Sequence, residues 1–309
     1  MKALSAINGG LILRRHRDFN AIYASLMAFV IVMAFSLGSN STAFASAEIG
    51  VSPLRALLTP NSSLKEIRIS NPSDRIIELR VSWTDLNATN DGYAPIPIEM
   101  RETLSAAPFL SVSPAFFRLE PGADAKVTIS INKSALKNEL NQNSNRYIER
   151  RSHLLFSSSA ARTPLRKAGG GLQADLGLSI SIPIHLRFGT AKIKQGEKRM
   201  RAEFSASQLV REDDGTLSIE TDVIREGPFS IFGKLDAEFQ AKGVRRAKPQ
   251  ALGSMDNATI HIENKRRRFR VRLNREELPA GVLTLRYVGR GEYSGRIFNE
   301  KVFSISGPK

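Results

Sequence analysis

One stretch of the chain constrains its fold more than any other: residues 171–189, GLQADLGLSISIPIHLRFG. Every even position from Leu172 to Phe188 is apolar, and the odd positions between them carry polar side chains, one glycine and one proline. This alternation predicts a β-strand with one apolar face, because successive side chains of a strand point to opposite sides of the sheet. Strands are usually about 5–6 residues long, so the fold must explain an unusually long apolar stripe.

Shorter stretches of the same kind fill the rest of the chain. They lie before and after the stripe at 64–71, 75–83, 125–132, 151–157 and at intervals from 202 to 305. Helical periodicity is scarce, with at best a short helical turn at 134–143. Many short strands separated by turn residues favour β-sandwiches, and 309 residues suffice for two domains. We therefore expect an all-β protein with an N-terminal domain over 48–190 and a C-terminal β-sandwich over 191–309.

The N-terminus has the pattern of a secretory signal peptide. Basic residues up to Arg17 precede an apolar run over 21–37, and small residues follow at Ala43, Ala45 and Ala47. A positive head, an apolar middle and a small-x-small site are typical of a cleaved export signal. We expect 1–47 to be this signal and the mature protein to lie outside the cytoplasm. Because the apolar run is slightly long, an uncleaved membrane anchor is the alternative.

The composition argues against enzyme and metal chemistry. Cysteine is absent, which excludes disulfides, thiol nucleophiles and cysteine-ligated metals. The four histidines, His16, His153, His185 and His261, show no zinc-binding spacing. Neither a GxSxG motif nor a phosphate-binding Walker loop is present. We expect no enzyme, no cofactor and no metal site, and an exported hydrolase is the weakest of the functions considered.

A basic stretch at 265–273, KRRRFRVRL, is a second candidate for function. As a strand it would place Arg268, Arg270 and Arg272 on one face and the apolar residues between them on the other. The simplest interpretation is a solvated strand with a buried apolar face. Its functional alternative is an exported immunoglobulin-like module that binds an anionic glycan or lipid surface, in keeping with the net charge of +15. Nucleic acid is disfavoured, because export is expected and exposed aromatic residues are not interleaved with the arginines.

Several segments together have the order and character of a known family. They are GVSPLRALLTP (50–60), RISNPSDRIIELRV (68–81), LSVSPAFFRLEPGADAKVTIS (110–130), YIERRSHLLF (147–156) and SISIPIHLRFG (179–189). In this order they resemble the periplasmic pilus or fimbria assembly chaperones of the chaperone–usher pathway. SPAFFRLEPG is the most specific block, and the segments after residue 224 are similar more loosely. The resemblance implies two immunoglobulin-like β-sandwiches in an L-shaped arrangement after a signal peptide, in the periplasm.

The resemblance also implies a use for the long stripe. Chaperones of this family lend the last strand of their first domain to a pilin subunit that lacks one strand, and then deliver the subunit to an outer-membrane usher. By alignment the lent side chains are Leu176, Leu178 and Ile180, with Leu172 and Ala174 as outer candidates. The later residues, 182–188, would face the protein's own core. Self-association of the empty chaperone is a further expectation.

A basic pair that holds the carboxylate at the end of the pilin is the second implied feature. Arg55 in SPLRALL matches the family's arginine. The family's second cation is a lysine on the long strand, where this chain has His185, with Arg187 two residues later on the same face. Either side chain is a candidate, and Arg187 is preferred because it is charged at any relevant pH. Pro183 lacks a backbone donor, so its edge of the strand must be unpaired or face a loop.

Overall fold

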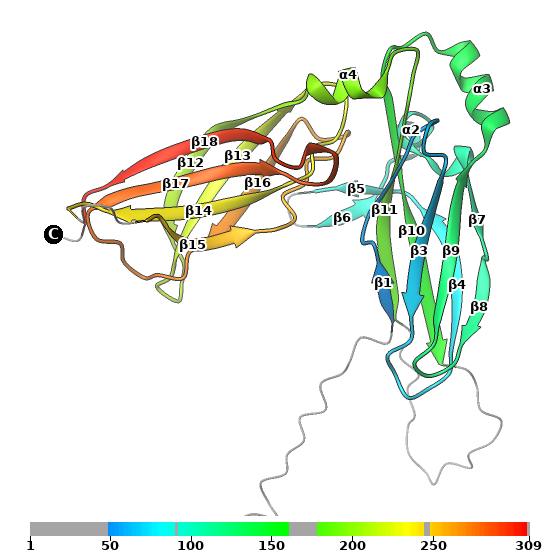
Figure 1. Cartoon of the computed structure of the whole chain (residues 1–309), viewed down its shortest axis with the longest axis horizontal. Helices are drawn as coiled ribbons and strands as arrows, with labels where there is room; N and C mark the ends of the chain where they lie inside the picture. The colour runs from blue at the N-terminus through cyan, green and yellow to red at the C-terminus, as the bar shows by residue number, and fades with distance from the viewer. Residues whose placement is uncertain (1–48, 90–91, 161–177, 244–247, 308–309) are drawn as a thin grey trace, which may run out of the picture. The chain divides into compact units, whose positions relative to one another are not determined.

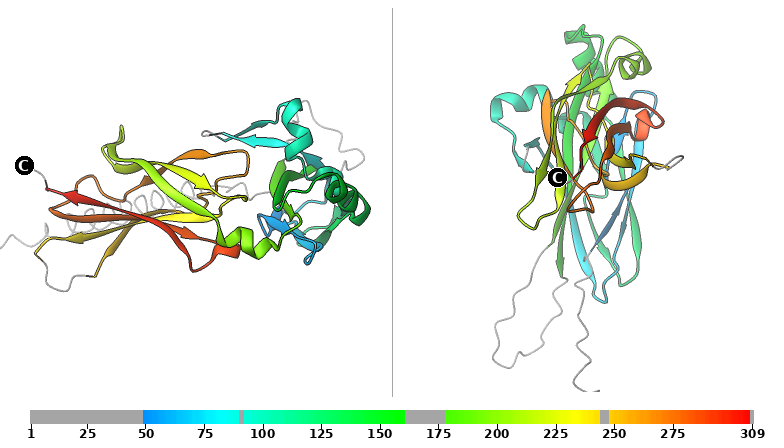
Figure 2. Two further views of the ribbon diagram at one scale, coloured as in Figure 1. Left: turned by 90° about the horizontal axis from the view of Figure 1, so that it is seen from above. Right: turned by 90° about the vertical axis from the view of Figure 1, so that its left-hand side faces the viewer.

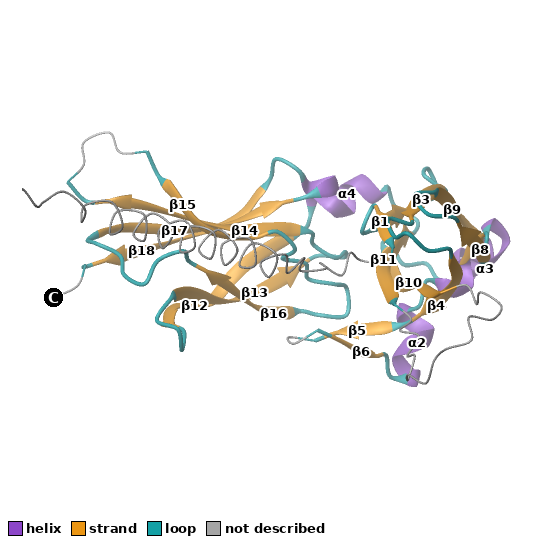
Figure 3. Ribbon diagram, turned by 90° about the horizontal axis from the view of Figure 1, so that it is seen from below, coloured by secondary structure: helices purple, strands orange, loops and turns teal. Residues whose placement is uncertain are grey.

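The structure is a computed structural model that describes residues 49–89, 92–160, 178–243 and 248–307. The predicted signal peptide at 1–47 lies outside the described residues. The described residues all belong to one compact unit. Strands dominate the described chain, and its helices are short (Figure 3). No helix in these ranges has the length and apolar character needed to cross a membrane.

The first half of the described chain forms a two-sheet sandwich. One sheet has the order β1 (Gly50–Ser52), β3 (Leu64–Ser70), β9 (Asp124–Ile131), β7 (Leu110–Ser113). The other has the order β2 (Ala56–Leu58), β11 (Ser179–Phe188), β10 (Ile148–Ala160), β4 (Ile77–Thr84), β8 (Phe116–Leu119) (Figure 1). Alternate side chains of both sheets fill one core, as the period of two requires.

The second half forms another two-sheet sandwich. One sheet has the order β12 (Arg201–Arg211), β13 (Leu217–Glu226), β16 (Arg266–Arg272). The other has the order β15 (Gln250–Met255), β14 (Gly233–Ala241), β17 (Gly281–Gly289), β18 (Ile297–Ile305) (Figure 1), and Figure 2 gives two further views of this sandwich. Helix α4 (Ile193–Lys198) lies between β11 and β12, and the 3-10 turn η2 (Gly291–Tyr293) follows β17. These two sandwiches confirm the predicted all-β fold class.

Short inserts decorate the first sandwich. A hairpin of β5 (Leu86–Ala88) and β6 (Tyr93–Pro95) precedes α2 (Ile98–Leu104) and the 3-10 turn η1 (Ala107–Phe109). Helix α3 (Lys133–Gln142) has 10 residues and lies where the sequence predicted at best a short helical turn, at 134–143. It begins at Asn132, whose side chain accepts a hydrogen bond from the Ala135 N–H. Only Leu136 of this helix is buried, which explains why its apolar periodicity is weak.

The long stripe is divided along β11. Its four last apolar residues, Ile182, Ile184, Leu186 and Phe188, are fully buried in the core of the first sandwich. This confirms the prediction that the later part of the stripe faces the protein's own core. Burial of each such side chain contributes about 1.5–3 kcal/mol, so this half of the strand is fixed in register.

Candidate functional site

Strand β11 has one open flank. On one side it pairs antiparallel with β10 along its whole length, from Ser179 to Phe188. On the other side it pairs only with β2, in parallel, over Ile184–Leu186. Residues 179–183 therefore have no partner strand on this flank among the residues that the structure describes. An exposed strand edge of this kind can accept a strand from another chain.

The hydrogen-bonding pattern shows which backbone groups face this flank. The Ser158 N–H donates to the Leu178 carbonyl at 2.8 Å, so Leu178 directs its backbone toward β10. Backbone groups alternate in direction along a strand, and the odd residues Ser179, Ser181 and Pro183 therefore direct theirs toward the open flank. Pro183 has no N–H, and at this position the protein's own sheet loses no hydrogen bond, because the flank has no partner strand there. This agrees with the expected unpaired position.

The predicted donor side chains fall partly within the described chain. Leu178 and Ile180 are half-buried and pack at the margin of the first core. Leu172, Ala174 and Leu176 lie outside the described residues. The apolar stripe thus continues to the open part of β11, although its side chains are less buried there than from Ile182 onward.

A cleft of about 830 Å³ lies at the end of the open edge. Arg55 lines it and immediately precedes β2, whose Ala56 pairs with Ile184, so Arg55 stands where the open flank ends. The other charged residues of the lining are Lys65, Glu66, Lys192, Lys194, Glu197 and Glu292. Three of these residues are lysines and three are glutamates, so with Arg55 the cleft has one more positive than negative side chain.

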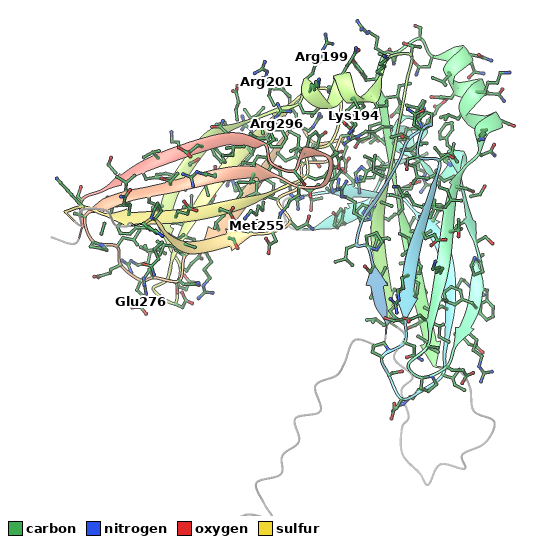
Figure 4. The ribbon with its side chains drawn as sticks, in the orientation of Figure 1. Lys194, Arg199, Arg201, Met255, Glu276 and Arg296 are labelled. Carbon is green, nitrogen blue, oxygen red and sulfur yellow. The ribbon has the colours of Figure 1, made fainter. Side chains whose placement is uncertain are left out.

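Helix α4 supplies one wall of this cleft. Lys194 projects from the helix (Figure 4) and its Nζ lies 3.2 Å from Glu197 Oε2. Arg296 donates to the carbonyl oxygens of Glu197 at 3.2 Å and of Met200. A cation at the Glu197 carbonyl is favourable because the last carbonyls of a helix carry partial negative charge. Arg296 therefore fixes the end of α4 and with it the position of Glu197.

The guanidinium of Arg55 is held by groups of the second sandwich. Its Nη1 and Nη2 donate to the same oxygen, Glu292 Oε2, at 3.3 and 3.2 Å. The guanidinium carbon lies 3.6 Å from the ring centroid of Phe232. Gly291 has φ +62°, and a Cβ there would lie 2.4 Å from Arg55 Nη2. The Arg55 side chain still keeps 26% of its surface exposed.

Arg187 lies behind Arg55 and is fully buried. Its Nε donates to Glu149 at 2.7 Å, its Nη1 lies 3.2 Å from Glu197 and 3.0 Å from Glu292, and its Nη2 donates to the Ser230 carbonyl at 3.1 Å. Burial alone would lower the pKa of Arg187, but the attraction of Glu149 and Glu292 raises it above its ordinary value. Arg187 is therefore a buried cation surrounded by carboxylates.

Glu149 joins Arg187 to His185. It accepts hydrogen bonds from His185 Nδ1 at 3.0 Å and from the Ser230 N–H at 3.0 Å. Burial would raise the pKa of Glu149, but Arg187, His185 and the Ser230 hydroxyl, which also donates to Glu149, lower it below its usual range. Burial lowers the pKa of His185 to about 4 and outweighs the opposing effect of Glu149. His185 is therefore neutral near pH 7.

His185 belongs to a cluster of three buried histidines. Its ring stacks on that of His261, with centroids 5.5 Å apart, and Tyr93 links His261 to His153 through a 3.1 Å contact and an edge-on ring contact. Burial lowers the pKa of His153 to about 3 and that of His261 well below its usual value. Within the described ranges no group of three or more His, Cys, Asp or Glu side chains could hold a metal ion.

The structure thus brings the three predicted anchor residues into one network. Arg55 and Arg187 contact the same carboxylate, Glu292, and His185 joins them through Glu149. Of the three, only Arg55 lines the cleft; His185 and Arg187 are each fully buried. The carboxylates of this network were not among the residues predicted from the sequence. Glu149 lies in the recognised YIERR segment, but no local pattern connects position 292 with position 55.

The basic strand is β16, and its arginines are accompanied by acids. Arg268 Nε lies 2.9 Å from Asp222. Arg270 lies 3.0 Å from Glu220, and Arg272 pairs with Asp214. The apolar residues of the basic stretch, Phe269, Val271 and Leu273, are buried. These contacts favour the simpler interpretation, a solvated strand whose charges are balanced by the neighbouring strand and turn.

Comparison with known proteins gives structural but not sequence matches. No family model and no curated protein matches the sequence. Among the solved structures, the YadV chaperone matches with 11% identity and TM-score 0.42, over 83% of this chain and 100% of that chain. The CupB2 chaperone of Pseudomonas aeruginosa matches with 15% identity and TM-score 0.41, over 83% and 100%.

A third match is a complex, the Salmonella enterica SafA pilin with the SafB chaperone, at 13% identity and TM-score 0.40, over 83% of this chain and 96% of that one. Many of the matching structures are chaperones of pilus assembly, as the sequence resemblance predicted.

Proposed function

We propose that this protein is a periplasmic chaperone that binds pilin or fimbrial subunits by donor-strand complementation and delivers them to an outer-membrane usher. The observation that carries the proposal is the open flank of β11 at 179–183, which ends at a charged cleft lined by Arg55. A periplasmic location rests on the export signal predicted over 1–47.

Strand addition is supported by the chemistry of the flank. Ser179 and Ser181 offer N–H and carbonyl groups, and Pro183 offers a carbonyl, so a guest strand would form main-chain hydrogen bonds that do not depend on its sequence. Beside these groups, Leu178 and Ile180 lie at the margin of the core. Each can contribute up to about 1.5–3 kcal/mol if a guest covers it fully, and the ordering of the guest offsets part of this gain.

The anchor for the carboxylate at the end of a subunit is proposed as a layered site. Arg55 contacts the carboxylate directly, because its side chain reaches the cleft and retains exposed surface. Lys192 and Lys194 line the same cleft and add positive charge. Arg187 and His185 act behind this contact, since Arg187 holds Glu292 beside Arg55 and His185 holds Glu149 against Arg187. A charge-assisted contact at this point would set the register of the guest strand.

Co-purification tests this function. The fimbrial subunits of the same genome are co-exported with the wild-type protein or with a Leu178→Asp, Ile180→Asp double variant. We expect a small β-rich subunit in about one-to-one ratio with the wild type and its loss from the double variant, because charges at the open edge cannot be buried. Phe116→Asp is the matched control, since Phe116 is an exposed apolar residue on β8, at the other edge of the same sheet. Subunit retained by the double variant, or lost equally from the control, contradicts the proposal.

A further inference from the structure

We infer that Glu292 is an internal substitute for the carboxylate of the guest. In the empty protein the Glu292 carboxylate pairs with Arg55. When a subunit binds, its terminal carboxylate replaces Glu292 at Arg55. This inference rests on the proposed function and assigns a residue that regulates the same site.

The geometry of the contact favours exchange. Both amino groups of Arg55 donate to a single oxygen, Glu292 Oε2, whereas the strongest arginine–carboxylate contact uses two oxygens in parallel. The other oxygen, Oε1, lies 3.0 Å from Arg187 Nη1. Glu292 is therefore shared between two arginines. It can leave Arg55 while it stays paired with the buried Arg187.

Arg55 keeps its position without Glu292. The ring of Phe232 covers one side of the guanidinium, and the missing side chain of Gly291 leaves the room that Arg55 Nη2 occupies. Neither contact depends on the charge of Glu292. Arg55 is thus pre-organised, and the cost of ordering it does not fall on the incoming carboxylate.

The charges explain what such a substitute achieves. Arg187 is already surrounded by Glu149, Glu197 and Glu292, so a further carboxylate at Arg55 meets the negative charge of Glu292 a few ångströms away. Isolated carboxylates should therefore bind weakly. A subunit whose strand pairs with β11 holds its terminal carboxylate at a high effective concentration and can displace Glu292. Glu292 thus makes the anchor respond to strand pairing rather than to any passing anion.

Titration with acetate, the smallest carboxylate probe, tests this inference on the isolated protein. Binding is followed by the NMR signal of the Arg55 Nε–H in the wild type and in Glu292→Gln, which keeps the shape but removes the charge. We expect acetate to bind Glu292→Gln about tenfold more tightly than the wild type, as the loss of one nearby like charge implies. Glu197→Gln is the matched control, because Glu197 pairs with Arg187 and Lys194 and also lines the cleft.

An equal gain in Glu197→Gln, or no gain in Glu292→Gln, overturns the inference. If Glu292→Gln does not fold, Glu292→Asp replaces it, because this side chain keeps the charge but is too short to reach both arginines. We then expect acetate affinity to rise about threefold. An unchanged acetate affinity contradicts the inference. Co-purification with Glu292→Gln separates this inference from the proposed function. If no variant or wild type retains a subunit, the chaperone function fails, while the acetate titration still decides whether Glu292 blocks Arg55.

Discussion

Two groups of arginines, both expected from the sequence to meet anions, lie in opposite environments. Arg187 is fully buried, Arg55 keeps 26% of its side chain exposed, and the two share Glu292. Arg270 and Arg272 on β16 are 56% and 62% exposed, and each lies beside acids of its own sandwich. The comparison teaches that a run of basic residues identifies candidates, while burial and the supply of nearby acids decide which cation can serve a ligand.

The largest expected difference between the groups is in stability. Arg187→Ala should lower the free energy of unfolding by about 3–5 kcal/mol, because Glu149 is left buried without its cation. Urea unfolding followed by near-ultraviolet circular dichroism measures this change. A loss of less than about 1 kcal/mol would place Arg187 in the same class as the exposed arginines.

Arg55 should matter for binding rather than for stability. Arg55→Ala is expected to weaken subunit binding about 10- to 100-fold, since a charged hydrogen bond is worth about 1.5–3 kcal/mol. Its effect on unfolding should be small because the side chain is partly exposed. Calorimetric titration with a purified subunit checks the first value, and unchanged affinity would remove Arg55 from the anchor.

The buried histidines sharpen the comparison through pH. The pKa of His185 is lowered to about 4 in the folded protein, whereas an unfolded histidine titrates near 6.5. Below pH 6.5 the unfolded chain therefore binds the proton first, and stability falls as the pH falls toward about 4. The slope is about 1.4 kcal/mol per pH unit for each such histidine. Urea unfolding between pH 6.5 and 5 measures how the free energy of unfolding depends on pH. In His185→Gln this dependence should be weaker by the contribution of one histidine. An unchanged dependence would mean that His185 is not buried as a neutral group.

The smallest effect is expected on β16. Arg270→Ala should change the free energy of unfolding by about 1 kcal/mol or less, because Arg270 is an exposed partner in ion pairs. It should also leave binding to vesicles that contain anionic lipid unchanged in a sedimentation assay. A clear loss of vesicle binding would instead favour the anionic-surface module as the protein's function.

The sequence predicted what depends on local pattern. The alternation of apolar residues located β11 and the buried half of its stripe, and Pro183 correctly pointed to an edge without a required donor. The Arg55–Glu292 contact joins residues 237 positions apart and depends on the packing of one sandwich on a turn of the other. Such a contact has no local periodicity. Helix α2 was not expected either, because it has no buried residue and therefore no apolar periodicity that marks it as a helix.

Amide hydrogen exchange at Ser179 and Ser181 tests whether a guest strand pairs with β11, because these N–H groups face its open flank. We expect rapid exchange in the empty protein and strong protection when a fimbrial subunit is bound, with the neighbouring amides of Ile180 and Ile182 protected in both states by β10. Protection of Ser179 and Ser181 in the empty protein, or continued rapid exchange in the complex, would show that no guest strand pairs with this edge.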